Sequence, residues 1–191
     1  MSIDLQIDNF NKIVKHILLY GCECWGLSNN HILEKVQLKF LKSVLNVKSS
    51  TPNCMLYGET GVKPLQIDID TRIVTYWAKL VAPTYDKLSV LMYKSMLSRL
   101  MQINITNANS FKWICYVRTV LIKCGLVNIW NNQSVPNLLW LKKTVSLKLS
   151  DLFINNWYST INMSSKCKKT IEFTRLHLDL KNTCEIHQLS F

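Results

Sequence analysis

Glycine, proline and acidic side chains are all scarce in this chain. Its 191 residues include 5 glycines, 4 prolines and 12 acids, whereas 48% of the residues are hydrophobic. This balance excludes a collagen-like protein, which needs a glycine repeat, and an intrinsically disordered one, which has few apolar residues. A chain of this length can bury one good core, or two small ones, without a metal or disulfides.

A long hydrophobic run is also missing. A membrane span requires roughly 18 consecutive apolar residues, whereas the apolar segment 17–27 is short and contains Glu23. The first residues include Asp4 and Asp8, and they lack the basic segment and apolar block of a secretory signal. We therefore expect an intracellular protein, in the cytoplasm or the nucleus, with no membrane partner.

The cysteines do not form a disulfide or zinc pattern. They are odd in number and lie in apolar, helix-like surroundings, so we expect reduced thiols that pack as small hydrophobic groups. Cys22 and Cys24 are separated by one residue, not the two of a zinc finger, and the late set of Cys167, His177, Cys184 and His187 is irregularly spaced. We expect no metal or other cofactor. The cysteines are Cys22, Cys24, Cys54, Cys115, Cys124, Cys167 and Cys184.

The sequence lacks the usual catalytic motifs. No two aspartates are adjacent, so the aspartate pair with which a polymerase binds two divalent ions is missing. There is no Gly-x-Ser-x-Gly, and the glycine pair at 58–61 is not followed by the Gly-Lys-Ser/Thr of a phosphate loop. Asp68 and Asp70 would point to different sides of a helix, which predicts two solvated acids. We expect the isolated chain not to be an enzyme, unless residues remote in sequence form a site.

Apolar residues recur at intervals of three or four along most of the chain. No alternating strand pattern exceeds this helical one, so the fold class is predicted to be all-α. The prediction is an irregular bundle or array of about seven to eight helices, with Gly125 as a left-handed cap and a short linker around Trp130. The expected helices cover residues 8–20, 30–47, 51–57, 64–82, 88–100, 111–124 and 136–158, with a last one after Ser164 or Ser165.

Positive charge is concentrated in the second half of the chain. The formal net charge is +11, and no acid occurs between Asp86 and Asp151. Because the expected helix also stops near residue 82, we predict a division into units 1–82 and 83–191. A basic half favours a nucleic acid or another anionic surface as partner. A solvated surface on a basic protein is the alternative. The bases in this interval are Lys87, Lys94, Arg99, Lys112, Arg118, Lys123, Lys142, Lys143 and Lys148.

A glycine-flanked corner at 20–26 joins the first two predicted helices. It contains Trp25, which we expect to be buried in the core because an indole buries a large area; a stacking platform is the alternative. In the helix that follows, Val36 groups with the apolar side, whereas three lysines group on the opposite side. Such a ridge either solubilises the helix or tracks nucleic-acid phosphates. The three lysines are Lys35, Lys39 and Lys42.

The corner and this helix resemble the segment after the polymerase core in reverse transcriptases of LINE-type (non-LTR) retrotransposons, where the thumb and post-thumb helices lie. The resemblance continues more loosely to the aromatic pair at 157–158. Its first part consists of Tyr20, Gly21, Glu23, Trp25, Ile32, Val36, Gln37, Phe40 and Lys42. Its second part consists of Thr51, Pro52, Leu56, Tyr57, Gly58, Glu59, Pro64, Leu65, Arg72, Trp77 and Lys79.

The resemblance implies a thumb-like helical unit at 1–82 and a basic post-thumb unit at 83–191. It implies that these helices grip RNA or an RNA/DNA hybrid behind the active site of a polymerase, while the catalytic palm and the endonuclease are missing here. The rest of a reverse transcriptase is then a further possible partner.

We hypothesise that the chain binds the backbone of RNA or of an RNA/DNA hybrid without sequence specificity. The alternative is a helical structural or protein-interaction module, or an inactive relic with no activity of its own. The residues expected to contact phosphates are Lys35, Lys39, Lys42, Lys48, Lys112, Arg118, Lys142, Lys143 and Lys148.

Overall fold

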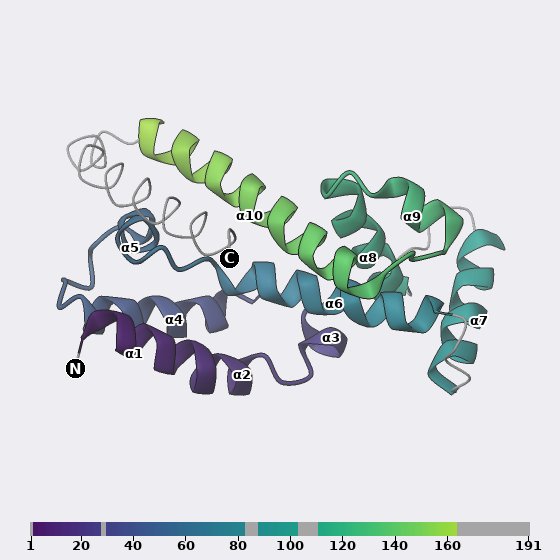
Figure 1. Cartoon of the computed structure of the whole chain (residues 1–191), viewed down its shortest axis with the longest axis horizontal. Helices are drawn as coiled ribbons and strands as arrows, with labels where there is room; N and C mark the ends of the chain where they lie inside the picture. Colours follow the sequence, from purple (N-terminus) through teal and green to yellow (C-terminus); the bar gives the residue numbers. More distant parts are fainter. Residues whose placement is uncertain (1, 28–29, 83–87, 103–110, 164–191) are drawn as a thin grey trace, which may run out of the picture. The chain divides into compact units, whose positions relative to one another are not determined.

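A computed structural model describes residues 2–27, 30–82, 88–102 and 111–163. Every regular element in these ranges is a helix, which confirms the all-α class (Figure 1). None of these helices is long and apolar enough to span a membrane. The helices are α1 (Ile3–Asn9), the π-helix η1 (Phe10–Val14), α2 (Lys15–Leu18), α3 (Cys22–Trp25), α4 (His31–Val44), α5 (Asn53–Thr60), α6 (Leu65–Val81), α7 (Leu88–Gln102), α8 (Lys112–Lys123), α9 (Val127–Asn132) and α10 (Leu138–Met163).

Several helix ends follow local sequence signals. The hydroxyl of Ser2 accepts a hydrogen bond from the Leu5 N–H at 3.3 Å and caps α1. Gly125 has φ 70°, and the next residue, Leu126, donates its N–H to the Leu121 carbonyl at 2.8 Å. This is the Schellman arrangement, so the prediction of a left-handed cap at Gly125 is confirmed.

Other boundaries differ from the prediction. The first helical stretch begins at Ile3 and not at residue 8, because Ser2 caps it. The expected linker around Trp130 is the short helix α9, since the indole of Trp130 is buried and stacks on that of Trp77 with ring centroids 5.7 Å apart. The last predicted helix, after Ser164 or Ser165, lies outside the described residues.

The chain forms two compact units, and neither is continuous in sequence. Among the described residues, unit 1 comprises 2–18, 31–65 and 150–163, and unit 2 comprises 19–27, 30, 66–82, 88–102 and 111–149. The first half of α10 therefore belongs to unit 2 and its second half to unit 1. The predicted boundary at residue 82 differs from this division. A long helix can contribute to two cores, and neither the charge balance nor the helix ends along the sequence reveal this. A thumb and a post-thumb role for 1–82 and 83–191 stays a prediction.

Unit 1 has a small apolar core that joins α4 to α5. Leu38 and Leu41 of α4 pack with Leu56 of α5. The rings of Phe10 and Phe40 stack with centroids 4.3 Å apart, which ties η1 to α4. Trp157 of α10 is buried beside this core, and its indole N–H donates to the Cys54 carbonyl at 2.7 Å.

A polar cluster fixes the orientation of α4 in unit 1. Glu34 accepts hydrogen bonds from the Tyr57 hydroxyl at 2.5 Å and from the Leu65 N–H at the start of α6 at 2.9 Å. Gln37, fully buried, donates to the Lys63 carbonyl at 3.0 Å. The expectation that Val36 faces the core is therefore wrong: its side chain is 41% exposed, because these hydrogen bonds turn Glu34 and Gln37 inward.

Unit 2 is built around α6. The indole of Trp77 is fully buried and donates to the Tyr93 hydroxyl at 2.9 Å. Gly26, after α3, lies so close to α6 that a Cβ there would come 2.6 Å from the Ile69 side chain. The corner at 20–26 can approach α6 only with glycine at this position. The other fully buried side chains of the unit include Ile73, Ile114, Val117, Leu121, Leu141 and Val145.

Candidate nucleic-acid interface

The predicted basic residues of unit 1 come from α4 and the segment that follows it. Lys35 and Lys39 are exposed and four residues apart, so they lie on one face of α4. Lys48 is exposed after the helix. Lys42 is half-buried, and its ammonium group donates to the Ser49 carbonyl at 2.7 Å. The predicted ridge of three lysines is thus a pair, because Lys42 holds the following segment.

The predicted basic residues of unit 2 come from α8 and α10, and all of them are exposed. On α8, Lys112 and Arg118 lie about 120° apart around the helix axis, at about 100° per residue. On α10, the directions of Lys142, Lys143 and Lys148 differ by about 100° or more. These cations surround the exposed sides of their helices, and they do not form one line.

One acid of unit 2, Asp70, contributes little to the charge at its surface. Asp70 is buried, and its carboxylate accepts hydrogen bonds from Gln66 at 2.6 Å and from the Tyr116 hydroxyl at 2.7 Å. Burial raises the pKa of Asp70 above its ordinary value, against the opposing effect of these two hydrogen bonds. The expectation of two solvated acids is therefore wrong for Asp70. No local signal reveals this, because Tyr116 is 46 residues away.

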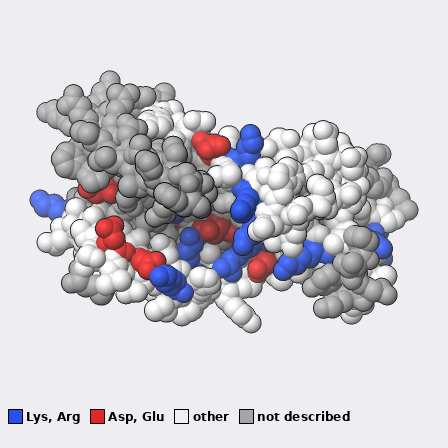
Figure 2. All heavy atoms as spheres, viewed as in Figure 1, with Lys and Arg blue, Asp and Glu red and all other residues white. Residues whose placement is uncertain are grey.

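On the molecular face in Figure 2, basic side chains lie among neutral surface with some acids between them. Within unit 2, the cations of α8 and α10 point in different directions around their helices, so a nucleic acid would meet separate positive side chains there. Long lysine and arginine side chains can still reach phosphates, which repeat along a strand.

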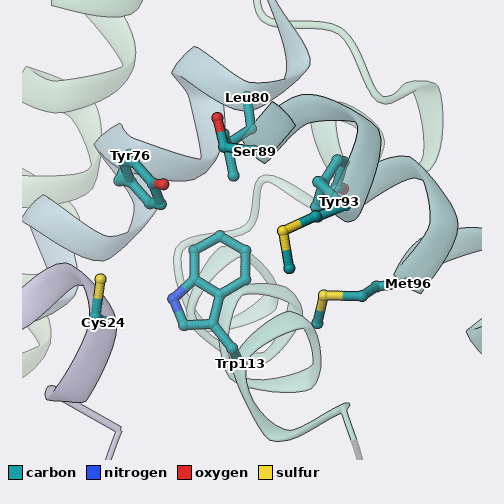
Figure 3. A pocket seen from close by; sticks show the side chains of 8 residues that line it. Cys24, Tyr76, Leu80, Ser89, Tyr93, Met96 and Trp113 are labelled. Carbon is teal, nitrogen blue, oxygen red and sulfur yellow. The ribbon is translucent and has the colours of Figure 1, made fainter. Parts of the chain in front are cut away.

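Unit 2 also contains an open pocket that the sequence did not predict. It has a volume of about 300 Å³ and is lined by residues of α3, α6, α7 and α8 (Figure 3). The Trp113 ring meets Tyr76 edge-on at 5.9 Å and Tyr93 edge-on at 6.5 Å. The lining residues include one thiol but no histidine and no acid. The lining residues are Cys24, Tyr76, Leu80, Ser89, Met92, Tyr93, Met96 and Trp113.

Two polar groups of the pocket wall are already engaged within unit 2. The indole N–H of Trp113 donates to the Glu23 carbonyl at 2.7 Å. The Tyr93 hydroxyl accepts from Trp77 and donates to Gln133 at 2.5 Å. Burial raises the pKa of Tyr93, so its hydroxyl stays neutral. The aromatic walls are held rigidly and present an uncharged surface.

Trp25 does not fill the core as predicted. Its side chain is 42% exposed, and its indole N–H donates to the Tyr20 carbonyl at 2.9 Å. This bond spans the turn at Gly21, whose φ is 66°. Trp113 of α8 also contacts this corner, through its indole N–H and the Glu23 carbonyl. The corner is therefore held in place without a buried Trp25 ring.

The described residues contain no group of three or more histidines, cysteines or acids that could hold a metal ion. None of the five cysteines in the described ranges forms a disulfide, and burial raises the pKa of both Cys22 and Cys124 to about 11. The late set of Cys167, His177, Cys184 and His187 lies outside these ranges.

Comparison of this chain with protein-family models, with curated proteins and with solved structures finds no match.

Proposed function

We propose that this chain binds the backbone of RNA or of an RNA/DNA hybrid without sequence specificity, as a non-catalytic part of a LINE-type reverse transcriptase. One observation carries the proposal. Unit 2 exposes Lys112, Arg118, Lys142, Lys143 and Lys148 within a stretch of sequence that has no acid from 87 to 150.

The physical reason is release of counterions. A side chain that neutralises a phosphate frees a condensed cation, and the affinity then falls steeply as the salt concentration rises. Contacts of this kind position a strand but do not read its bases. Cations distributed around α8 and α10, which form no single line, suit such contacts better than they suit a precise base-reading surface.

The experiment is a titration of a labelled 20-nucleotide RNA and of the matching RNA/DNA hybrid between about 50 and 300 mM salt. If four of the five cations contact phosphates, the slope of log affinity against log salt is about −2.8 to −3.6, at 0.7 to 0.9 per contact. Two RNA sequences of equal length should bind with similar affinity. A flat salt dependence would contradict the proposal.

A pair of matched variants separates local contacts from total charge. Lys142→Gln with Lys143→Gln removes two proposed contacts on α10, and should reduce the slope by about 1.4 to 1.8. Lys12→Gln with Lys63→Gln removes the same net charge elsewhere, and Lys12 already pairs with Asp8 at 2.6 Å. The control should change the slope much less. Equal effects of the two variants would show that only the total charge matters.

A protein-interaction module is the second candidate. The helical stretch at 3–18 exposes Ile13 to 61%, Val14 to 37% and Ile17 to 72%, so one side of it is apolar and open to solvent. Exposed apolar surface of this kind is typical of protein contacts. Ile13→Ser with Ile17→Ser should then abolish self-association or partner binding while leaving RNA affinity unchanged. If neither self-association nor partner binding changes in this variant, the second candidate fails.

A further inference from the structure

The pocket of unit 2 has an aromatic, uncharged lining that suits a flat, uncharged ring. Trp113 lies between Tyr76 and Tyr93, both edge-on to it, so its ring is held at a fixed tilt. In Figure 3 the Trp113 ring stands in the middle of the lining side chains, with Met96 on one side and Cys24 on the other. Aromatic rings and methionine sulfur are favourable neighbours for another ring.

The volume sets the size of the occupant. About 300 Å³ corresponds to roughly ten water molecules at about 30 Å³ each. A purine has about the same number of non-hydrogen atoms as this volume has waters. An aromatic ring system of one or two rings therefore fits, whereas a folded peptide segment does not.

Exposed cations stand close in sequence to the lining residues on three of the four helices that form the pocket. Lys79 follows Tyr76 by three residues on α6, and Arg99 follows Met96 by three on α7; each pair therefore shares a helix face. Lys112 directly precedes Trp113 at the start of α8. There is no acid in α7 or α8. The occupant should therefore combine an aromatic ring with negative charge.

We propose that this pocket receives one unpaired base of a bound RNA or DNA strand, while Lys79, Arg99 and Lys112 hold the neighbouring phosphates. The inference rests on the proposed function and adds a specific site to it. The pocket is open, so the polar edges of the base remain in water. Since the lining residues stack on the base and do not read its edge, any of the four bases is accepted.

The test compares two hairpins with the same number of phosphates, one fully paired and one with a single bulged 2-aminopurine. The bulged hairpin should bind at least fivefold more tightly, as expected for stacking of one base, and its fluorescence should change on binding. Equal affinity of the two hairpins for the wild-type protein would overturn the inference.

Variants of Tyr76 link this preference to the pocket. Tyr76→Ala should remove the preference and leave affinity for the paired hairpin unchanged, whereas Tyr76→Phe, which keeps the ring, should retain it. Tyr20→Ala is the matched control, since Tyr20 is 84% exposed and is not part of the lining. If Tyr20→Ala and Tyr76→Ala have the same effect, the pocket is not the site.

Protection of Cys24 gives a readout that does not depend on affinity. Its thiol lines the pocket and is exposed, so the bulged hairpin should slow its alkylation more than the paired one. Decanoate, an aliphatic acid with a negative charge but no ring, is the competing probe. If decanoate protects Cys24 and the bulged hairpin does not, the pocket takes an aliphatic acid and the inference fails. If neither hairpin binds at all, the proposed function fails with it; if the paired hairpin binds and no bulge preference appears, only the inference fails.

Discussion

Replacing Trp157 tests the most specific long-range contact in unit 1. This side chain is 7% exposed, packs beside Tyr57 and Phe153, and donates its N–H to the Cys54 carbonyl across 103 residues of sequence. Trp157→Ala removes a buried indole and its hydrogen bond, so we expect a loss of about 3 to 5 kcal/mol in the free energy of unfolding. Trp157→Phe keeps one ring and loses the hydrogen bond, which costs about 1 to 2 kcal/mol.

Thermal unfolding followed by circular dichroism measures these losses. At about 2 to 4 °C per kcal/mol for a chain of this size, Trp157→Ala should lower the midpoint by about 6 to 20 °C and Trp157→Phe by about 2 to 8 °C. Leu152→Ala is the control, because Leu152 lies on the same helix and is 41% exposed. It should lower the midpoint by less than about 4 °C, as expected for a side chain that is only partly covered.

The two units provide an internal comparison for the same variants. Cys54 lies in unit 1 beside Trp157, and Cys115 lies in unit 2; both thiols are half-buried. Loss of the indole should speed alkylation of Cys54 and leave that of Cys115 unchanged, because opening is local. Equal acceleration at both thiols, or no change at Cys54, would refute the placement of Trp157 against α5.

Two further predictions concern titratable groups of unit 2. Because burial raises the pKa of Asp70 in the folded protein, ionisation of its carboxyl group opposes folding. The protonated form contributes stability at low pH, and this stability is lost as the pH rises from the ordinary aspartate pKa of about 4 through the higher pKa of the folded protein. Asp70→Asn should flatten this part of the curve in pH-dependent urea unfolding, and an unchanged curve would contradict the assignment. At pH 8, Cys24 should be alkylated before Cys22 and Cys124, because these two thiols are buried and, with pKa values of about 11, only about one in a thousand of them is ionised. Mass spectrometry of the labelled peptides would show the order of labelling. Faster labelling of Cys22 would refute the prediction.

Local sequence signals predicted the class of the fold and many helix ends. A period of three to four residues and the glycine at 125 depend only on nearby residues, and both predictions are confirmed. Such a period shows which side chains share a face, but not which neighbour covers that face. The inward turn of Gln37 depends on the Lys63 carbonyl, 26 residues away, so helical spacing alone predicts the wrong side for Val36.

The candidate sites show the same limit. The positions of the lysines could be read from the sequence, and most of them are exposed as a phosphate-binding role requires. Their directions around α8 and α10 could be estimated from helix geometry alone. The pocket could not be predicted from the sequence, because its walls come from four helices. The hydrogen bond from Trp113 to Glu23, for example, joins residues 90 positions apart.

Repulsion between the cations of unit 2 affects the stability of the unit. Its helices α7 and α8 contain no acid, so their cations gain no attraction from within these helices and repel one another in the folded state. Repulsion of this kind destabilises a compact unit, and salt or a bound polyanion reduces it. A strand that binds the folded unit more tightly than the unfolded chain must stabilise it in proportion to that difference. The proposed phosphate binding would therefore be coupled to the stability of unit 2, since the same cations would contribute to both.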